Sequence, residues 1–188
     1  MDLKDGQAIR CLGVDLGQAQ DHPSMVTAVG MPKTEKWLTM IKELPLQLSY
    51  VTIADAILKL ENHHDIVIVD SGGVGRAVLD MLRKEKSKAW GLGLTGSGKG
   101  KIDRGRRMMT MAKRKLVMGV RLHLVDGLIK VSPDVGKDDA LAWLEQMRAF
   151  QAKGNKFEAA SGTHDDIVIA TANAIFGVEQ YPLLEPDQ

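Results

Sequence analysis

The sequence predicts an α/β domain built around a mixed sheet, and three observations carry this prediction. Residues 8–16 form a largely buried strand pattern, and two further strand-like stretches, 24–30 and 35–44, follow across turn signals. That order is typical of an antiparallel meander. The apolar run DIVIVD (65–70) is bounded by polar residues, as a buried parallel strand would be. Helical and strand patterns then alternate, so helices should flank the sheet.

The other elements follow from apolar periodicity. Ser49 fits a helix N-cap, because Ile53 and Ile57 after it share one helical face. His63 and His64 are interpreted as the solvated end of that helix. The remaining expected elements are a helix after the glycine turn 71–73, a strand in KAWGLGL, a basic helix over about 103–118, a strand near VRLHLV, a helix over about 138–148, an irregular hairpin in KGNKFEAASG and a last helix over about 165–178. We expect one domain over residues 1–180 and a frayed tail over 181–188.

Length and composition narrow the class of protein. A chain of 188 residues that is 44% hydrophobic can bury one substantial core. No uninterrupted apolar run reaches the ~18 residues of a membrane span, and the N-terminus lacks the pattern of a secretory signal. The single cysteine, Cys11, excludes an internal disulfide and lies in an apolar run, so we expect a buried thiol. These features predict a cytoplasmic protein without a membrane partner.

Charge is unevenly distributed along the chain. The net charge is only +1, yet residues 97–122 contain nine Lys or Arg and a single acid, Asp103. That window carries +8, so the rest of the chain carries −7. Such segregation favours a polyanionic partner such as nucleic acid or phosphate.

Four carboxylates fall at the ends of predicted elements. Asp15 ends the first strand, Asp70 ends the fourth, and Asp165 and Asp166 open the last helix. If the first and fourth strands are parallel neighbours, all four lie at one edge of the sheet. Each could separately be a turn residue or a helix cap. Together they suit Mg²⁺ or Mn²⁺, and two such ions can support phosphodiester hydrolysis.

Three stretches resemble a known family: GVDLG, VIVDSGGVGRAVLDML and EAASGTHDDIVIATANAIF. They are similar to the three acidic motifs of the nuclease domain of phage large terminases, which belongs to the RNase H-like superfamily. That domain cuts concatemeric viral DNA during genome packaging. The third motif is the most specific of the three, and the resemblance covers nearly the whole chain.

The resemblance implies roles for individual residues. Asp15 and Asp70 would be catalytic metal ligands, and Asp166 is favoured as the third ligand. Asp165 would cap the helix or act as an outer partner of the metal site. His164 would orient a water or contact a phosphate. Two Mg²⁺ or Mn²⁺ ions would be the cofactors.

The stretch GLGLTGSGKG (91–100) has the G-x-x-x-x-G-K spacing of a phosphate-binding loop from Gly93. Gly100, however, stands where a Ser or Thr hydroxyl would hold Mg²⁺, so we interpret the stretch as a flexible basic loop. In the predicted basic helix, residues seven apart would share one side. The residues expected to contact the DNA backbone are Lys99, Lys101, Arg104, Arg106, Arg107, Lys113 and Arg114.

The sequence thus predicts a metal-dependent endonuclease acting on double-stranded DNA with little sequence preference. A terminase ATPase domain, a small terminase subunit and a portal are the other expected partners, in the cytoplasm of the host cell. No ATPase motif precedes Asp15, which fits either an excised domain or a free-standing relative. The alternatives are a resolvase or transposase-type nuclease on the same fold, a nucleotide-binding module, and a catalytically silent DNA-binding domain.

Overall fold

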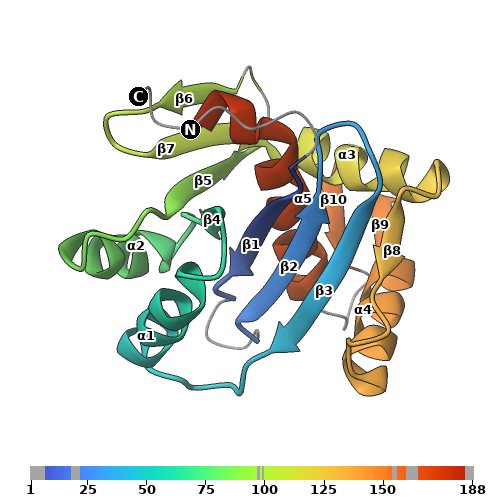
Figure 1. Cartoon of the computed structure of the whole chain (residues 1–188), viewed down its shortest axis with the longest axis horizontal. Coiled ribbons are helices and arrows are strands. Elements are labelled where there is room, and N and C mark those ends of the chain that lie inside the picture. The colour runs from blue at the N-terminus through green and yellow to red at the C-terminus, as the bar shows by residue number, and fades with distance from the viewer. Residues whose placement is uncertain are drawn as a thin grey trace.

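The structure is a computed structural model that describes residues 7–17, 22–96, 98, 100–153, 156–159 and 165–184. Strands and helices form a central sheet with helices on both faces (Figure 1). The strands are β1 (Ile9–Asp15), β2 (Ser24–Gly30), β3 (Lys36–Glu43), β4 (Ile66–Asp70), β5 (Trp90–Thr95), β6 (Lys101–Asp103), β7 (Met108–Ala112), β8 (Ile129–Val131), β9 (Phe150–Lys153) and β10 (Lys156–Ala159). The helices are α1 (Tyr50–Glu61), α2 (Gly75–Lys84), α3 (Lys113–Val125), α4 (Lys137–Ala149) and α5 (Asp166–Leu184).

The main sheet has eight strands in the order β6-β7-β5-β4-β1-β2-β3-β8. Strands β1, β2 and β3 form the predicted antiparallel meander. On the other side of β1, strands β4, β5 and β7 all run parallel to it. The mixed sheet predicted from the sequence is therefore confirmed, and β9 and β10 form the separate expected hairpin.

The predicted basic helix over 103–118 is wrong in its first half. Strands β6 and β7 form an antiparallel hairpin there, and α3 begins only at Lys113. Consequently Arg106 and Arg107 do not share a helical side with Lys113 and Arg114. The strand predicted near VRLHLV is also wrong, because those residues form the end of α3. A short strand, β8, follows further along the chain.

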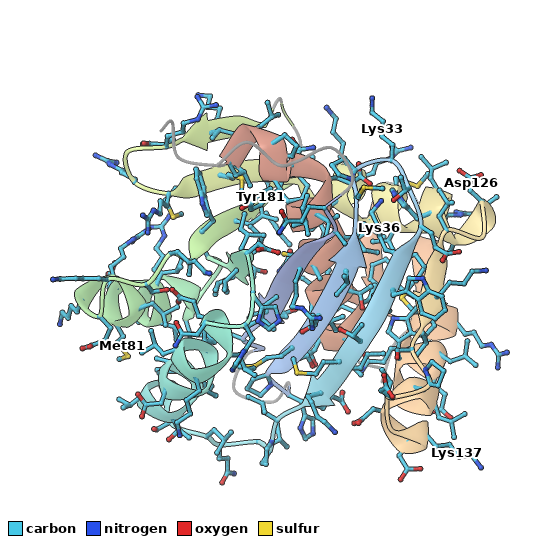
Figure 2. All side chains as sticks on the ribbon, in the orientation of Figure 1. Lys33, Lys36, Met81, Asp126, Lys137 and Tyr181 are labelled. Carbon is cyan, nitrogen blue, oxygen red and sulfur yellow. The ribbon has the colours of Figure 1, made fainter. Side chains whose placement is uncertain are left out.

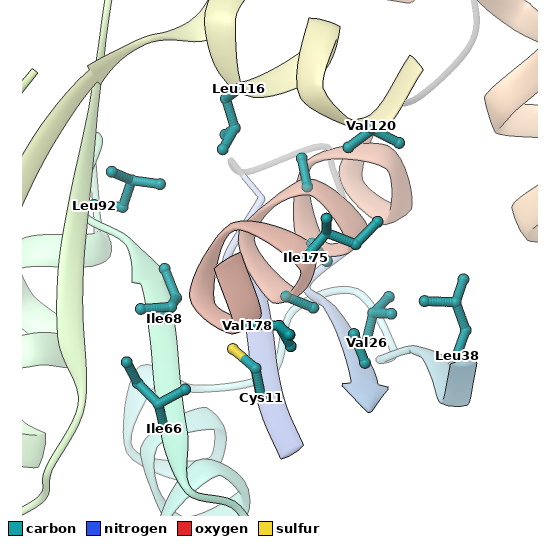
Figure 3. Close-up of a cluster of buried hydrophobic side chains, with 14 of the residues drawn as sticks. Cys11, Val26, Leu38, Ile66, Ile68, Leu92, Leu116, Val120, Ile175 and Val178 are labelled. Carbon is teal, nitrogen blue, oxygen red and sulfur yellow. The ribbon is translucent and has the colours of Figure 1, made fainter. Parts of the chain in front are cut away.

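Each face of the sheet carries its own hydrophobic core. Helices α3, α4 and α5 cover one face, and α5 lies behind the central strands in the view of Figure 1. Helices α1 and α2 cover the other face. Figure 3 shows the first core, in which Cys11 faces Ile68 and Val178. The expected buried thiol is confirmed, and burial raises the pKa of Cys11.

Helix α5 approaches the sheet closely enough to contact backbone. A Cβ on Gly13 of β1 would lie 2.1 Å from the carbonyl oxygen of Ala170 and 2.3 Å from the nitrogen of Ala174. By length and composition α5 could span a bilayer, but 67% of that stretch is buried inside the domain. The helix continues to the buried Leu184, so residues 181–184 are not the predicted tail, and 185–188 lie outside the described residues.

A buried lysine links β3 to α5 at the end of the sheet opposite Asp15. Lys36, labelled in Figure 2, begins β3. Its ammonium contacts the carboxylate of Glu179 on α5. The Nε2 atom of His123, near the end of α3, lies 3.1 Å from the same carboxylate. The lysine side chain is fully buried, so this contact supplies the paired charge that a buried ammonium needs.

His64 is buried, in contrast to the solvated position expected from the sequence. Its Nδ1 lies 2.7 Å from the carbonyl oxygen of Leu60, which can only accept, so Nδ1 carries the proton. Its Nε2 lies 2.8 Å from the hydroxyl of Thr27, which donates to it in the neutral ring. Burial lowers the pKa of His64 from its ordinary value of 6.5. The residue therefore has a structural role as a neutral imidazole.

This burial predicts a pH-dependent stability. The unfolded chain takes up a proton on His64 near pH 6.5 and the folded protein does so only at lower pH. The free energy of unfolding should therefore fall as the pH falls through 6.5. Replacing His64→Gln should flatten this part of the curve, whereas His63→Gln at the exposed neighbour should not. Denaturant unfolding of the three proteins between pH 7.5 and pH 5 measures the slopes, and an equal slope for all three would contradict the assignment.

Candidate active site

The strand register places Asp15 and Asp70 side by side. Val14 of β1 pairs with Val69 of the parallel strand β4, and the two aspartates are the next residues in each strand. The backbone N–H of Gly17 donates to Oδ1 of Asp15 at 3.2 Å, which orients that carboxylate. Both aspartates are half-buried, so the sheet edge presents two carboxylates that are only partly hydrated.

The glycine turn after β4 orients Asp70. The backbone N–H of Gly72 donates to Oδ1 of Asp70 at 2.7 Å. A Cβ on Gly75 would lie 2.0 Å from the backbone oxygen of Asp70, so only glycine lets α2 begin this close to the strand. Gly73 has a φ of +48°, which glycine adopts at little cost. The segment SGGVG therefore serves a tight turn, as expected from its sequence.

Helix α5 brings two more carboxylates to the same edge. Asp166 is its first residue and is buried, while Asp165 precedes it and is partly exposed. The backbone N–H of Ile167 donates to the side-chain oxygen of Gln146 on α4 at 3.0 Å, which satisfies one free donor at the helix start. All four aspartates line one pocket of about 170 Å³.

The gathered negative charge changes the acidity of the site. Burial raises the pKa of Asp15 well above its usual range, and repulsion from Asp70, Asp166 and Asp165 raises it further. Burial also raises the pKa of Asp70, although the N–H of Gly72 and the positive charge of Lys113 act in the opposite direction. The pocket therefore holds more negative charge than the protein neutralises, which favours protons or cations there.

Lys113 is the one cationic side chain in the described lining of this pocket. It is the first residue of α3, and its Nζ lies 2.9 Å from Oδ2 of Asp165. The lysine was expected on a DNA-binding helix face, but the structure places it among the carboxylates. Its charge pairs with Asp165 and also acts on Asp70.

The donor chemistry of the pocket fits a hard divalent cation. Its described lining offers carboxylate oxygens and no histidine or sulfur ligand, which is the set that Mg²⁺ and Mn²⁺ prefer. Within the part of the chain that the structure describes, no three Asp, Glu, His or Cys side chains converge at metal-binding spacing. The carboxylates therefore form an open pocket and not a closed cage.

A second, larger hollow lies between α2 and the β6–β7 hairpin, and we call it the hairpin groove. Its volume is about 1,330 Å³, and its floor includes Leu79 and Met109. Arg83 on α2 reaches across it and donates to the backbone oxygen of Arg106 at 3.0 Å. The basic side chains lining the groove are Arg76, Arg83, Lys86, Lys101, Arg104, Arg106 and Arg107.

Comparison with known proteins places the chain in a family. The sequence model of the terminase RNase H-like domain matches residues 12–177, which is most of the chain and includes all four aspartates. The chain belongs to this family. Its RNase H-like fold and its resemblance to terminase nucleases are thereby confirmed. Among curated proteins, none matches this sequence.

Solved structures agree with the family on the fold. The large terminase nuclease of thermophilic phage G20c with bound magnesium is 22% identical, with a TM-score of 0.59 over 91% of this chain and 82% of that one. The human cytomegalovirus terminase nuclease domain is 15% identical, with a TM-score of 0.57 over 93% and 86%. The nuclease domain of the large terminase from bacteriophage SPP1 with bound manganese is 15% identical, with a TM-score of 0.56 over 90% and 85%.

In this terminase nuclease domain, most of the predicted site residues line either the carboxylate pocket or the hairpin groove. Asp15, Asp70, Asp165, Asp166 and Lys113 share the carboxylate pocket. The other predicted basic residues lie elsewhere: Lys101, Arg104, Arg106 and Arg107 line the hairpin groove, and Arg114 is exposed on α3. His164 and Lys99 lie outside the described residues, so their predicted roles stay predictions.

Sequence reasoning missed Asn173, which positions the strand that carries Asp15. Asn173 is fully buried on α5, and its side-chain N–H donates to the backbone oxygen of Val14 at 2.9 Å. Val14 directly precedes Asp15, so this bond fixes the strand end against the helix. The signal was an amide side chain within the apolar stretch 167–178 of α5, because a buried amide must find a partner.

The glycine-rich stretch in this terminase nuclease domain does not have the structure of a phosphate-binding loop. Such a loop joins a strand directly to a helix whose N-terminus faces the phosphates. Here the stretch after β5 leads into β6, and the next helix begins only at Lys113. Gly93 itself lies within β5, where a Cβ would come within 3.3 Å of the hydroxyl of Ser71. The geometry therefore disfavours the nucleotide-binding alternative.

Proposed function

We propose that this chain is a divalent-metal-dependent endonuclease that cuts double-stranded DNA during viral genome packaging. The observation that carries the proposal is the meeting of carboxylates from β1, β4 and α5 in one pocket at one edge of the sheet. The family and the shared fold support a nuclease, and the excess of carboxylates supports metal dependence.

The four aspartates divide into ligands and an outer partner. Asp15, Asp70 and Asp166 would hold two Mg²⁺ or Mn²⁺ ions, which when bound would activate a water and stabilise the leaving oxygen. Asp165 is paired with Lys113, so it serves as an outer partner at the helix start. This division supports the choice of Asp166 over Asp165 as third ligand, because Asp166 is the more buried of the two.

The protein's own groups prepare the pocket for the reaction. Turn N–H groups of Gly17 and Gly72 hold the carboxylates of Asp15 and Asp70 in fixed orientations. The raised pKa of Asp15 means that a proton must leave as a cation binds, so affinity for the cation should increase with pH. His164 is proposed to orient the attacking water or contact the phosphate.

The basic residues act on the DNA backbone. Lys99, Lys101, Arg104, Arg106, Arg107 and Arg114 would contact phosphates, which position a duplex without reading its sequence. Because these contacts do not read the bases, the nuclease should cut with only slight sequence preference. A terminase ATPase domain, a small terminase subunit and a portal, in the cytoplasm of the infected cell, would supply the choice of cut site.

The test is cleavage of supercoiled plasmid with Mn²⁺, Mg²⁺ or EDTA. We expect nicked and linear products with either metal and intact plasmid with EDTA. Asp70→Ala should remove the activity, and Asp55→Ala, at an exposed position on α1 outside the pocket and the groove, serves as the control that retains it. Tight binding of branched junctions with little cleavage of linear duplex would favour the resolvase alternative. Intact plasmid with every metal would favour a silent DNA-binding domain.

A further inference from the structure

Apart from Arg114 and Lys115, which follow Lys113 on α3, positive charge gathers on one side of the carboxylate pocket. The hairpin groove holds seven Lys or Arg side chains and two acids, Asp80 and Asp103. It lies toward β6, at one edge of the sheet. The opposite edge, formed by β8 and α4 (residues 126–149), has five acids and three bases. A polyanion crossing the pocket is therefore attracted to one flank and not to the other.

The hairpin groove begins about one helical turn from the pocket. Gly72 and Gly73 line the pocket, and Arg76 in the first turn of α2 lines the groove. Across the sheet, Asp70 is in register with Leu92 of β5, which is in register with Met109 of β7. Two strand spacings separate Asp70 from β7, about 10 Å. The groove follows the ten residues of α2, about 15 Å, and this helix begins beside the pocket at Gly75.

The lining of the groove suits a duplex backbone better than a single strand. Cations stand on both walls, on α2 and on the hairpin, as contacts to phosphates require. Proteins that bind single strands add aromatic side chains on which bases stack, and the described lining contains no aromatic residue. Proximity to the pocket also favours DNA over an acidic protein segment, since a cut duplex must leave the pocket along some surface.

We propose that the duplex extends from the carboxylate pocket along the hairpin groove only, so that the nuclease needs DNA on one side of the cut. This inference rests on the proposed endonuclease function. At 3.4 Å per base pair, the 15 Å of the groove corresponds to about four to five base pairs. On each strand the enzyme should therefore cut closer to one end, 5′ or 3′, than to the other, by about that number of base pairs.

The test maps every cut on end-labelled linear duplexes with Mn²⁺. We expect cuts on each strand to approach one of its ends, 5′ or 3′, about four to five base pairs more closely than the other. The variant Lys86→Gln with Arg106→Gln removes two exposed cations at the far end of the groove. In this variant, the difference between the two ends in how closely cuts approach them should largely disappear. The matched control, Lys130→Gln with Lys137→Gln on the opposite edge, should keep it.

A binding measurement separates this proposal from the proposed function. In the Asp70→Asn background with Ca²⁺, the groove variant should reduce the slope of log affinity against log salt by about 2, and the control should not change it. A one-sided hydroxyl-radical footprint that depends on the groove supports the inference even where cleavage itself fails. Symmetric cut distances, or salt slopes equal in the groove variant and its parent, would overturn it.

Discussion

Replacing Asp15→Asn should abolish plasmid cleavage and, in the metal-free protein, raise the melting temperature. The loss of activity should exceed about 100-fold, because even outer partners of a metal site cost 10–100-fold when removed. The gain in stability follows from the repulsion that Asp15 receives from three other carboxylates in a partly buried pocket. One substitution should thus move activity and stability in opposite directions.

The direction of the stability change follows from the pKa of Asp15. A carboxyl whose pKa is raised in the folded state binds its proton more tightly there than in the unfolded chain. That stability is present at acidic pH and is lost as the pH rises through the raised pKa. At neutral pH the folded protein therefore carries a penalty, which asparagine removes because it has no charge.

Scanning calorimetry with EDTA at pH 7.5 and at pH 4 measures the effect. We expect an increase of a few degrees at pH 7.5, on the scale of about 2–4 °C for each kcal/mol, and a smaller one at pH 4. Asp55→Asn, at an exposed position on α1, is the matched control and should change neither stability nor cleavage. A lower melting temperature for Asp15→Asn at pH 7.5 would contradict the electrostatic account.

Replacing Gly13→Ala should disrupt both the fold and the site, although residue 13 carries no functional group. The new Cβ would meet the backbone oxygen of Ala170 and the backbone nitrogen of Ala174, and backbone cannot rotate aside as a side chain can. Helix α5 would have to move away from β1, which would separate Asp166 from Asp15. We expect a loss of about 3 kcal/mol, or roughly 6–12 °C in melting temperature.

Gly119→Ala provides the matched control for this prediction. Gly119 lies inside α3, and a Cβ there would meet nothing within 4 Å. Alanine is favoured over glycine in a helix interior by about 1 kcal/mol, so this variant should be more stable than the parent. Both variants are compared by melting temperature and by plasmid cleavage. Equal stability of Gly13→Ala and the parent would show that α5 is not held in place by backbone contact.

The meander, the buried strand β4 and the start of α5 could be predicted because their patterns are local. Each has an apolar period or a bounded apolar run that does not depend on distant partners. The edge shared by Asp15, Asp70 and Asp166 followed from one further rule, that parallel strands place their carboxyl ends together. Close packing of α5 was not predictable in the same way, since it depends on Gly13 of a different element.

The β6–β7 hairpin could not be predicted, because it depends on pairing with a distant strand and not on a local pattern. Residues 103–112 are rich in Arg and Met, which favour helix by intrinsic propensity, and pairing of β7 with β5 overrides that preference. At the end of α3 the error was the reverse, because a strand was predicted where the structure has a helix. Val120, Leu122 and Leu124 alternate as a strand would, yet they lie on a helix that leaves Leu122 57% exposed.

The placement of Lys113 also required the structure. A lysine in a basic segment predicts contact with an external polyanion, and residues 97–122 contain eight other Lys or Arg that support this interpretation. Only the end of β7 against β5 brings α3 to the carboxylate edge, where the lysine meets Asp165. Lys113, which was expected to bind DNA, thus balances part of the negative charge of the pocket.

The separation of charge between the hairpin groove and the β8–α4 edge contributes an electric dipole along the plane of the sheet. In the field of a polyanion such a molecule experiences a torque before any contact forms. It turns its basic flank forward, so a larger share of encounters begin in a productive orientation. This effect raises the rate of association and does not change the contacts of the bound state. It weakens as ionic strength rises, because salt shortens the range of the field.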